Sequence, residues 1–512
     1  MLGSVLNAIA LLFSMITLVP LDDRPVTLQL PVMLGRIAGV PVRVPPRHLL
    51  GHYLAPGDPD AVIRWLNGPQ NRHAQAFVVS SDMLVYGGLV ASRVPTGASY
   101  QDAYFRLRAF AQVRAAHPRA WIAGFGTIMR LAPTGVPAIG SAANFFAAYP
   151  VWTYLQQYAN LHDPPLPNER ALAKKLRVAA GPAFDAYLAA RARDYAVDRE
   201  EINVLAGDAM NRLVLGQDDA GLVGLHVKDV RALRSAVDTL GLERRVAIEP
   251  GADELGMVLV AHALARRIGW HPRIAVRYSM PEGASYQDPL EFAPIGTTIQ
   301  ELVALSGGEE VRSDPDIVLD VRVPGTTGPL DDAFVSSMRA ELAAGHPVAL
   351  ADLTFLEPTY ASQAAFAARL LRDGLASRLE AYAAWNTDAN TVGTALAEAI
   401  AAGSGRRSGT YDALAHRDFT FMRFLDDDAF HAVVRPELNA ALDAQGVIDH
   451  TYLVRGVAAQ SAALNDALLW QQAVAMLPQL YPRDHIAFMR ISLPWNRTFE
   501  TKIRVRLAPT IR

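Results

Sequence analysis

Five acidic segments of this chain each follow a short apolar run, and this placement limits the possible fold more than any other feature. Short apolar runs that lead into helical patterns are typical of parallel strands in an α/β fold. In such folds ligands bind outside the carboxyl ends of the strands. We therefore expect an active site with several carboxylates at that edge. The acidic residues are Asp22 and Asp23, Asp82, Asp218 and Asp219, Asp253 and Glu254, and Asp352.

The order of apolar runs and helical patterns predicts an α/β fold with two domains and a helical C-terminal region. The first domain, residues 15–270, has a parallel sheet that is either open or a distorted barrel, with a helical insertion at 141–205. The second domain, residues 271–402, is expected to be Rossmann-like. The helical region, residues 403–512, begins with a Gly/Ser/Arg loop at 403–409 and ends in a closing strand at 503–507. The other expected strands are 16–21, 41–44, 76–81, 120–125, 212–216 and 245–249 in the first domain and 273–278, 317–323, 347–353 and 380–385 in the second.

The composition excludes several classes of protein. At 512 residues the chain is too long for one ordinary core. A net charge of −3 gives no reason to expect nucleic acid or an anionic membrane as a partner. The absence of cysteine excludes disulfides, thiolate metal sites and a cysteine nucleophile. We expect a soluble protein that binds a small molecule or an oligosaccharide, and the sequence does not define its oligomeric state.

Residues 4–21 are almost entirely apolar and uncharged, and no Lys or Arg precedes them. A secretory signal requires a basic segment at its start, and no other stretch approaches the about 20 apolar residues of a membrane span. Three interpretations stay open: a gene-start artefact before a true start at Met15, a signal-like segment, and a membrane anchor. We expect a cytoplasmic protein, while the signal-like N-terminus leaves export open.

Two acidic pairs are the candidate catalytic groups. At the end of a strand, neighbouring side chains point to opposite sides, so one carboxylate of Asp22-Asp23 can face the cleft while the other pairs with Arg24. In Asp218-Asp219, one member can stay protonated near neutral pH, because two close carboxylates do not easily ionise together. That member would supply a general acid. The alternative for both pairs is a helix cap with a solvated or ion-paired neighbour.

Candidate substrate-binding residues follow two further strands. Tyr86 and Arg93 can bind hydroxyl or carboxylate groups beside Asp82, although the same segment can be a structural turn. Trp385 can form an aromatic platform for a sugar ring, with Asn386 beside it to bind hydroxyls.

The remaining candidates have a competing structural role as helix caps. Asn390 can bind a substrate hydroxyl or cap the following helix. Asp253 and Glu254 can bind substrate, but Asp253 also has the position of an N-terminal cap.

No cofactor is expected. The 13 histidines contain no H-E-x-x-H or other tight ligand pair, which argues against a zinc site. Residues 80–89 have the spacing of neither a Walker loop nor G-x-G-x-x-G, which argues against binding of a nucleotide phosphate there. Magnesium bound only by aspartates stays open.

Six motifs in order resemble those of a bacterial family of uncharacterised proteins, domain of unknown function 4127. The resemblance spans nearly the full chain and implies a family whose sequences start close to the first strand. It implies no activity. The segment after Asp352 does not match the family pattern. The motifs are residues 20–25, 81–89 with Ser92 and Arg93, 216–220, 250–254, 385–387 with Asn390, and 494–500.

Together these residues predict a hydrolase that acts on a carbohydrate, because two carboxylates flank the bond in glycoside hydrolysis. Asp218 or Asp219 would be the acid, and Asp22 or Asp23 the nucleophile, the base or a positioning group. One alternative is a magnesium-dependent phosphoryl hydrolase or transferase with aspartates as ligands, and another is a non-enzymatic two-domain binding protein. The metal ligands would be Asp22, Asp82 and Asp218. The residues expected to line one pocket are Asp22, Asp82, Asp218 and Asn386.

Overall fold

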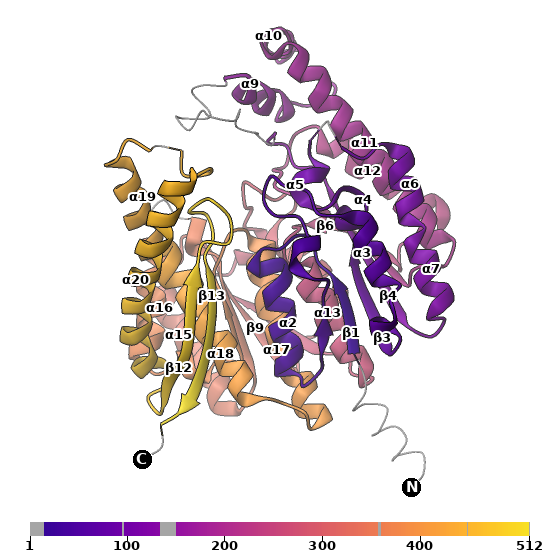
Figure 1. The fold of residues 1–512 in the computed structure, drawn as a ribbon. Helices are drawn as coiled ribbons and strands as arrows, with labels where there is room; N and C mark the ends of the chain where they lie inside the picture. The colour runs from indigo at the N-terminus through magenta and orange to yellow at the C-terminus, as the bar shows by residue number, and fades with distance from the viewer. Residues whose placement is uncertain (1–14, 95–96, 134–149, 357–359, 448, 511–512) are drawn as a thin grey trace.

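The protein contains two parallel β-sheets that lie side by side, with helices between and around them (Figure 1). The computed structural model describes residues 15–94, 97–133, 150–356, 360–447 and 449–510. Over these residues the first sheet is open, not a barrel, with six parallel strands in the order β2-β1-β3-β4-β5-β6. They match the six expected strands. The strands are β1 (Met15–Val19), β2 (Val42–Arg43), β3 (Ala74–Ser80), β4 (Trp121–Ile128), β5 (Arg212–Gln217) and β6 (Val246–Pro250).

The second sheet has five parallel strands in the order β11-β10-β9-β7-β8. In chain order this is 2-1-3-4-5, the flavodoxin-like arrangement of doubly wound folds. The first five strands of the first sheet have the same order. The expected Rossmann-like α/β unit is therefore confirmed. Its strands are β7 (Arg273–Tyr278), the unexpected short β8 (Glu309–Glu310), β9 (Ile317–Arg322), β10 (Val348–Asp352) and β11 (Ala381–Ala383).

Alternate residues of the central strands enter two different cores. Leu18 and Val78 pack into one hydrophobic cluster, and Val19 and Val79 pack into another on the opposite face of the first sheet. Burial on both faces explains why these strands are continuous apolar runs in the sequence. The helices and short helical turns of this part are η1 (Pro25–Gln29), α2 (Leu30–Ile37), η2 (Arg47–Leu49), α3 (Pro59–Leu66), η3 (Pro69–Asn71), α4 (Ser81–Tyr86), α5 (Leu89–Ser92), α6 (Tyr100–Leu107), α7 (Ala109–Ala116), α12 (His226–Leu240) and α13 (Leu255–Arg267).

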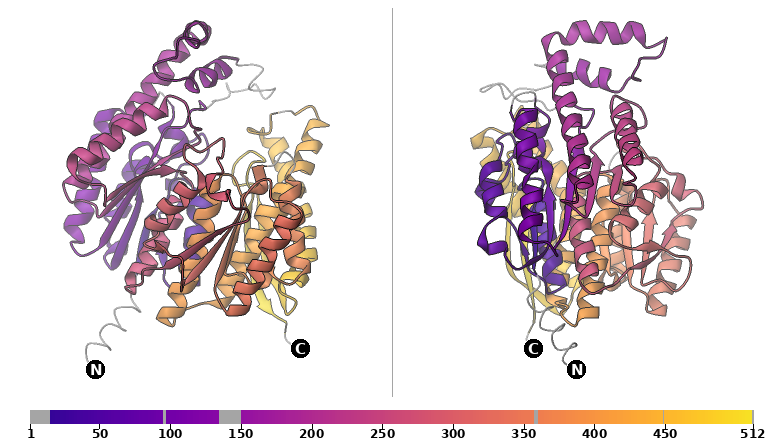
Figure 2. Two further views of the ribbon diagram at one scale, coloured as in Figure 1. Left: turned by 180° about the vertical axis from the view of Figure 1, so that it is seen from behind. Right: turned by 90° about the vertical axis from the view of Figure 1, so that its right-hand side faces the viewer.

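The insertion between β4 and β5 is helical where the structure describes it, as expected. Residues 141–149 of the predicted insertion lie outside the described residues. Helices α9 and α10 project beyond the first sheet (Figure 2), whereas the long α11 packs along it against β4 and β5. The three helices are α9 (Pro150–Ala159), α10 (Arg170–Ala180) and α11 (Pro182–Ala206).

Two helices form the layer between the sheets. Helix α13 packs against β1, β3 and β4 of the first sheet, and α17 packs against β9, β10 and β11 of the second. The two helices also pack tightly against each other, so one hydrophobic cluster runs through both sheets. The other helices and turns of the second part are η4 (Gly283–Ser285), α14 (Ile295–Leu305), α15 (Pro329–Ala344), η5 (Thr354–Leu356), α16 (Ala361–Arg372) and η6 (Ala376–Arg378), and α17 is Asp388–Ser408.

The predicted loop at 403–409 is wrong, because α17 continues to Ser408. Its glycines are needed for close packing. A Cβ on Gly403 would lie 2.6 Å from a ring carbon of Trp270, and one on Gly405 would lie 3.0 Å from the carbonyl oxygen of Ile37. Composition suggested a flexible loop, but the helix uses these small residues to approach its neighbours.

The C-terminal region is helical and ends in a two-stranded antiparallel hairpin. The expected closing strand is confirmed as β13, but its partner β12 was not predicted. Most side chains of β12 are exposed or half-buried, so its sequence lacks a regular alternation of apolar and polar residues. The elements are α18 (Ala413–Arg423), the π-helical η7 (Phe424–Val434), α19 (Arg435–Asp443), α20 (Arg455–Leu480), β12 (Asp484–Ser492) and β13 (Lys502–Pro509).

The three interpretations of the N-terminal segment stay predictions, because residues 1–14 lie outside the described residues. Strand β1 begins at Met15, one residue before its expected start. None of the described helices is long and apolar enough to cross a membrane.

Candidate active site

A cavity of about 350 Å³ lies at the carboxyl ends of strands from both sheets. Its wall combines the loops that follow the seven strands β1 to β7 with the start of α17 and two loops of the C-terminal region. The lining contains charged, amide and aromatic side chains together, as ligand sites commonly do. The lining residues are Arg24, Arg93, Arg130 and Arg497; Asp218, Asp219, Asp253, Glu291 and Asp449; Gln217, Asn386, Asn390, Thr387 and Thr451; Tyr53, Tyr452, Trp495 and Phe499; and Leu54, Leu89, Val90, Pro133, Gly251, Ala252 and Leu290.

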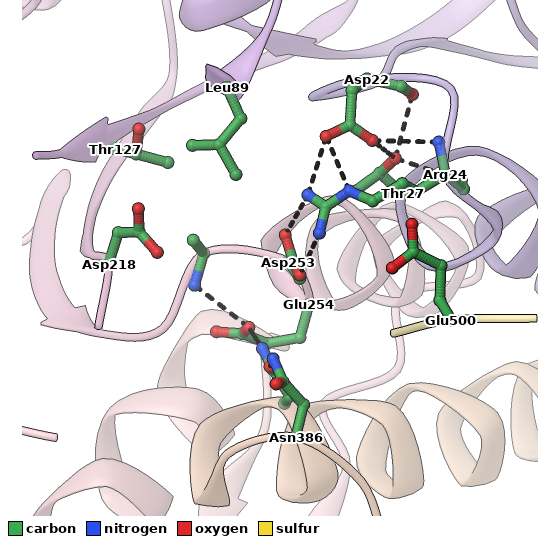
Figure 3. Close-up of polar contacts among 12 residues, drawn as sticks. Asp22, Arg24, Thr27, Leu89, Thr127, Asp218, Asp253, Glu254, Asn386 and Glu500 are labelled. Carbon is green, nitrogen blue, oxygen red and sulfur yellow. Dashed lines mark hydrogen bonds and ion pairs between the residues drawn. The ribbon is translucent and has the colours of Figure 1, made fainter. Parts of the chain in front are cut away.

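Arg24 is fixed between two carboxylates (Figure 3). Its Nε donates to Asp22 Oδ2 at 2.8 Å, and its two terminal nitrogens donate to the two oxygens of Asp253 at 2.7 and 2.6 Å. Burial disfavours the charge on Arg24, but Asp22 and Asp253 outweigh this, so the pKa of Arg24 is raised above its usual value. Asp22 therefore holds Arg24 from behind and does not line the cavity. Asp253 does line it and is not the predicted helix cap, because Glu254 precedes α13 at that position.

Asp23 points away from the cavity, as alternation at a strand end predicts. It accepts hydrogen bonds from Arg47 Nε at 2.8 Å and from Trp495 Nε1 at 2.7 Å, and it contacts His52 Nδ1 at 2.9 Å. Burial raises the pKa of Asp23, but the bonds to His52, Trp495 and Arg47 outweigh it and leave the pKa below its ordinary value. Asp23 thus anchors the C-terminal segment to the first sheet, and it does not line the cavity.

Asp218 and Asp219 both line the cavity, but each has its own arginine. Asp218 forms an almost fully buried ion pair with Arg93, and Asp219 lies 3.4 Å from Arg130 with its side chain 34% exposed. Burial raises the pKa of Asp218, partly offset by Arg93, and Asp219 raises it further. Among the described residues no hydrogen bond joins the two aspartates. The sequence therefore located the pair. In the structure, however, each aspartate binds a different arginine, and Asp219 is more exposed than Asp218.

Asp82 and Tyr86 lie behind the cavity wall, not in it. Ser80 caps α4 and places Asp82 in its first turn, where Asp82 Oδ1 accepts a hydrogen bond from Thr127 Oγ1 at 3.1 Å. Burial raises the pKa of Asp82 to about 7. Tyr86 packs under the guanidinium of Arg193, 4.8 Å from the ring centre. The expectation that Asp22 and Asp82 line the pocket with Asp218 and Asn386 is thus wrong for the first two, whose side chains support the wall.

Asp82 belongs to a group of four buried carboxyls that we call the buried acid cluster: Asp82, Asp194, Asp198 and Glu201. The last three project from α11 and are almost fully buried. Burial raises the pKa of each well above its ordinary value, and the other members raise it further. The cluster therefore favours the protonated, uncharged form of its members.

Asn386 and Asn390 join the start of α17 to the cavity. Asn386 has a left-handed backbone, with φ of 61°, and its amide donates to Asn390 Oδ1 at 2.6 Å. Asn390 donates in turn to Glu254. Thr387, not Asn390, caps α17. Glu254 itself is buried behind the wall, which raises its pKa to about 8.

Trp385 is not the predicted platform of this cavity. Its side chain is buried, and its indole nitrogen donates to Thr394 Oγ1 at 3.1 Å. The aromatic lining comes instead from segments that the sequence did not single out as one surface. The Tyr53 ring stacks on Trp495 with centroids 5.1 Å apart, and Arg497 lies over both rings. Tyr452 extends this surface, with its centroid 6.1 Å from that of Tyr53.

Glu291 is the acid that sequence reasoning missed. It lines the cavity, and its Oε1 accepts a hydrogen bond from the backbone of Ala389 at 2.5 Å. Burial, with a further contribution from Asp288, raises the pKa of Glu291 to about 8. The nearby hydrogen bond from Ala220 N to Leu290 O, at 2.9 Å, ties its loop to the segment of Asp219. Glu291 follows no apolar run, so the rule that found the other acids does not apply to it.

No group of three or more His, Asp or Glu side chains in the described part of the chain is arranged to hold a metal ion. The three aspartates considered as magnesium ligands do not form one set. Asp22 binds Arg24, Asp218 binds Arg93, and Asp82 lies behind the wall.

The fold and the site define the class: a protein with two parallel, doubly wound sheets and a cavity of arginine-paired aspartates at their carboxyl edge. The chain belongs to the family described as protein of unknown function DUF4127, whose model matches residues 16–504. The resemblance drawn from the six motifs is therefore confirmed. No curated protein and no solved structure matches the chain significantly.

Proposed function

We propose that the cavity is the active site of a hydrolase that acts on a carbohydrate. The observation that carries this proposal is the presence, in one cavity, of a buried glutamate without a basic partner among the described residues and of aspartates paired with arginine. Burial raises the pKa of Glu291 to about 8, which favours its protonated form at neutral pH, whereas Asp219 is partly exposed beside Arg130. Glycoside hydrolysis needs such a division between an acid and a base or nucleophile.

In this proposal Glu291 is the general acid and protonates the leaving oxygen. Asp219 is the second carboxylate, because it is the more accessible aspartate of the pair and lies on the segment bonded to the Glu291 loop. Asp218 is a positioning residue that fixes Arg93 in the wall. Asp22 and Asp23 take supporting roles, since neither lines the cavity.

The lining favours an uncharged, hydroxyl-rich substrate over an anion. Each arginine already has a carboxylate partner: Asp22 and Asp253 bind Arg24, Asp218 binds Arg93, Asp219 binds Arg130 and Glu500 binds Arg497. The amides of Gln217, Asn386 and Asn390 suit hydroxyl groups. The surface of Tyr53 and Tyr452 suits the apolar face of a sugar ring.

The test is Glu291→Gln, assayed on a panel of aryl glycosides of neutral sugars. A general acid typically contributes ~10²–10⁴-fold to the rate, so we expect a loss of that order for substrates with a poor leaving group. The loss should be much smaller for a dinitrophenyl glycoside, whose leaving group needs little protonation. Glu249→Gln is the matched control, because Glu249 is an equally buried glutamate, on β6, that does not line the cavity.

Two outcomes would contradict the proposal. If Glu291→Gln loses the same factor on every leaving group, or no more than Glu249→Gln, Glu291 is not the acid. If sugars raise the melting temperature of the wild type and no glycoside is cleaved, the cavity belongs to a binding protein.

A further inference from the structure

One face of the C-terminal hairpin carries four cations in neighbouring positions, and we call these residues the basic hairpin face: Arg490, Lys502, Arg504 and Arg506. Along β13 the side chains alternate, so Ile503 and Val505 are buried while Arg504 and Arg506 are exposed. Arg490 of β12 lies directly opposite Arg504 of β13 in the antiparallel register. The face is separate from the candidate active site, because none of its residues lines that cavity.

The pairing of Arg490 with Arg504 is unfavourable for the fold itself, whereas Arg506 lies over the Phe488 ring, 5.3 Å from its centre. Like charges directly opposite each other in a sheet are destabilising, and no ion pair within the described residues neutralises any of the four. Burial, together with the cations Arg47, Arg504 and Arg490, lowers the pKa of Lys502 to about 8, although Asp23 opposes this shift. In contrast, the arginines at the active-site cavity are all paired with carboxylates. The whole chain has a net charge of −3, so composition does not explain this concentration of positive charge.

A groove of about 440 Å³ lies between the basic hairpin face and the first helices of the chain. Lys502, Arg504 and Arg506 form one wall, and Arg36 of α2 adds a fourth cation, whereas Arg490 does not line the groove. The opposite wall is apolar and includes Val32 and Met33 of α2.

Two polar groups in the groove complete its description. Asp418 is the acid in its lining, and its side chain accepts a hydrogen bond from the backbone of Leu507 at 2.7 Å. Gln29 donates to Ile503 O at 2.6 Å, while its Oε1 is buried and has no hydrogen-bond partner. With four cations and one acid, the lining is strongly positive.

We propose that this groove is a second ligand site, which binds a small anion carrying two or more phosphate groups. Phosphate fits the donors, because the guanidinium fork binds its oxygens in pairs and an ammonium adds a point charge. More than one phosphate fits the spacing, because residues two apart on a strand are about 7 Å apart, which places Lys502, Arg504 and Arg506 in a row. The small volume of the groove, about 440 Å³, and the net negative charge of the chain favour a small anion over a nucleic acid.

The experiment is titration calorimetry of the full chain at low ionic strength with phosphate, pyrophosphate and tripolyphosphate. We expect affinity to rise with the number of phosphates and to fall with added salt, as screening of an electrostatic site requires. In Lys502→Gln/Arg504→Gln the affinity for tripolyphosphate should fall at least about tenfold, the effect of about 1.4 kcal/mol of lost interaction. The matched control is Arg64→Gln/Arg231→Gln, which removes the same charge from two exposed helical arginines outside the groove.

Stability without ligand gives a second, independent readout. Because the two substitutions remove repulsion from Arg490, the melting temperature of Lys502→Gln/Arg504→Gln at low salt should equal or exceed that of the wild type. The proposal is overturned if the wild type does not bind tripolyphosphate, if the control loses as much affinity as the hairpin variant, or if a nucleic-acid duplex binds more tightly than tripolyphosphate. A hairpin variant that melts below the control would assign these cations to the fold and overturn the proposal as well.

Discussion

The buried acid cluster ties the stability of the fold to pH through single carboxyl groups. Burial raises the pKa of Asp82 from an ordinary 3.8 to about 7. The folded chain then holds this proton more tightly than the unfolded chain. Its stabilising contribution is therefore complete below about pH 4 and is lost as the pH rises through about 7.

Asp82→Asn tests this link. The variant has no proton to release at that position, so its free energy of unfolding should fall less steeply between about pH 4 and 7 than that of the wild type. The difference between 3.8 and about 7 corresponds to at most about 4 kcal/mol. Asp194, Asp198 and Glu201 should leave a residual slope. Urea unfolding over this range measures the effect, and Asp60→Asn, an exposed acid, should keep the wild-type slope.

Asp218→Asn and Asp219→Asn should both lose most turnover but differ in stability. Asp218 neutralises the buried Arg93, and removal of one partner from a buried ion pair destabilises a fold by about 3–5 kcal/mol. Asp219 is one-third exposed, so its replacement should change stability by about 1 kcal/mol or less. The structure thus revises the expectation that both variants fold nearly as well as the wild type. Chemical unfolding beside the glycoside assay measures both effects, and wild-type rates in Asp219→Asn would remove it from the mechanism.

At the scale of elements, the sequence predicted the parallel strands well and the packing of the helices poorly. A strand buried on both faces leaves a continuous apolar run, such as residues 76–79 in β3. The last turns of helix α17, residues 403–408, leave no such mark, because they consist of Gly, Ser and Arg, which also occur in loops. What distinguishes a packed helix of this composition from a loop is the close approach of Trp270 to Gly403. This is a tertiary contact, which the sequence does not show.

Gly403→Ala tests that contact. Alanine normally stabilises a helix over glycine by about 1 kcal/mol, but here the new methyl group would lie 2.6 Å from a Trp270 ring carbon. We expect a net loss of about 1–2 kcal/mol, as overpacking of a dense interior produces. Gly456→Ala in α20 is the control, because nothing lies within 4 Å of the added atom, and it should be neutral or stabilising. A gain in stability for both variants in thermal unfolding would show that the α17 contact is not tight.

At the scale of the whole molecule, the site is assembled from segments that lie far apart in the sequence. The acids after β1, β5 and β6 were predictable, since parallel strands end at one edge of their sheet. Asp23 and Trp495 are 472 positions apart, and no pattern in either segment predicts their hydrogen bond. Glu291 enters the cavity from a loop that is bonded to the loop after β5 and to the start of α17. Functional side chains at strand ends can thus be predicted from one sequence. Side chains that reach the cavity from other layers cannot, because their position depends on how the layers pack together.

The two sheets should unfold as one unit, although the sequence predicts a domain boundary at about residue 270. Ten of the thirteen residues of α13 are buried. The helix packs on α17, which covers the second sheet, as well as on the first sheet. Separation of the two sheets with their helices would expose α13 and α17 to water. This exposure costs a free energy of about 25 cal/mol per Å² of apolar surface. Calorimetry and circular dichroism of the full chain should therefore give one coincident transition. A fragment of residues 15–270 should bind a hydrophobic dye and lack a cooperative transition, because its α13 has lost α17. Two separate transitions in the full chain, or a sharp one in the fragment, would mean that the shared core contributes little and that each sheet is stable by itself.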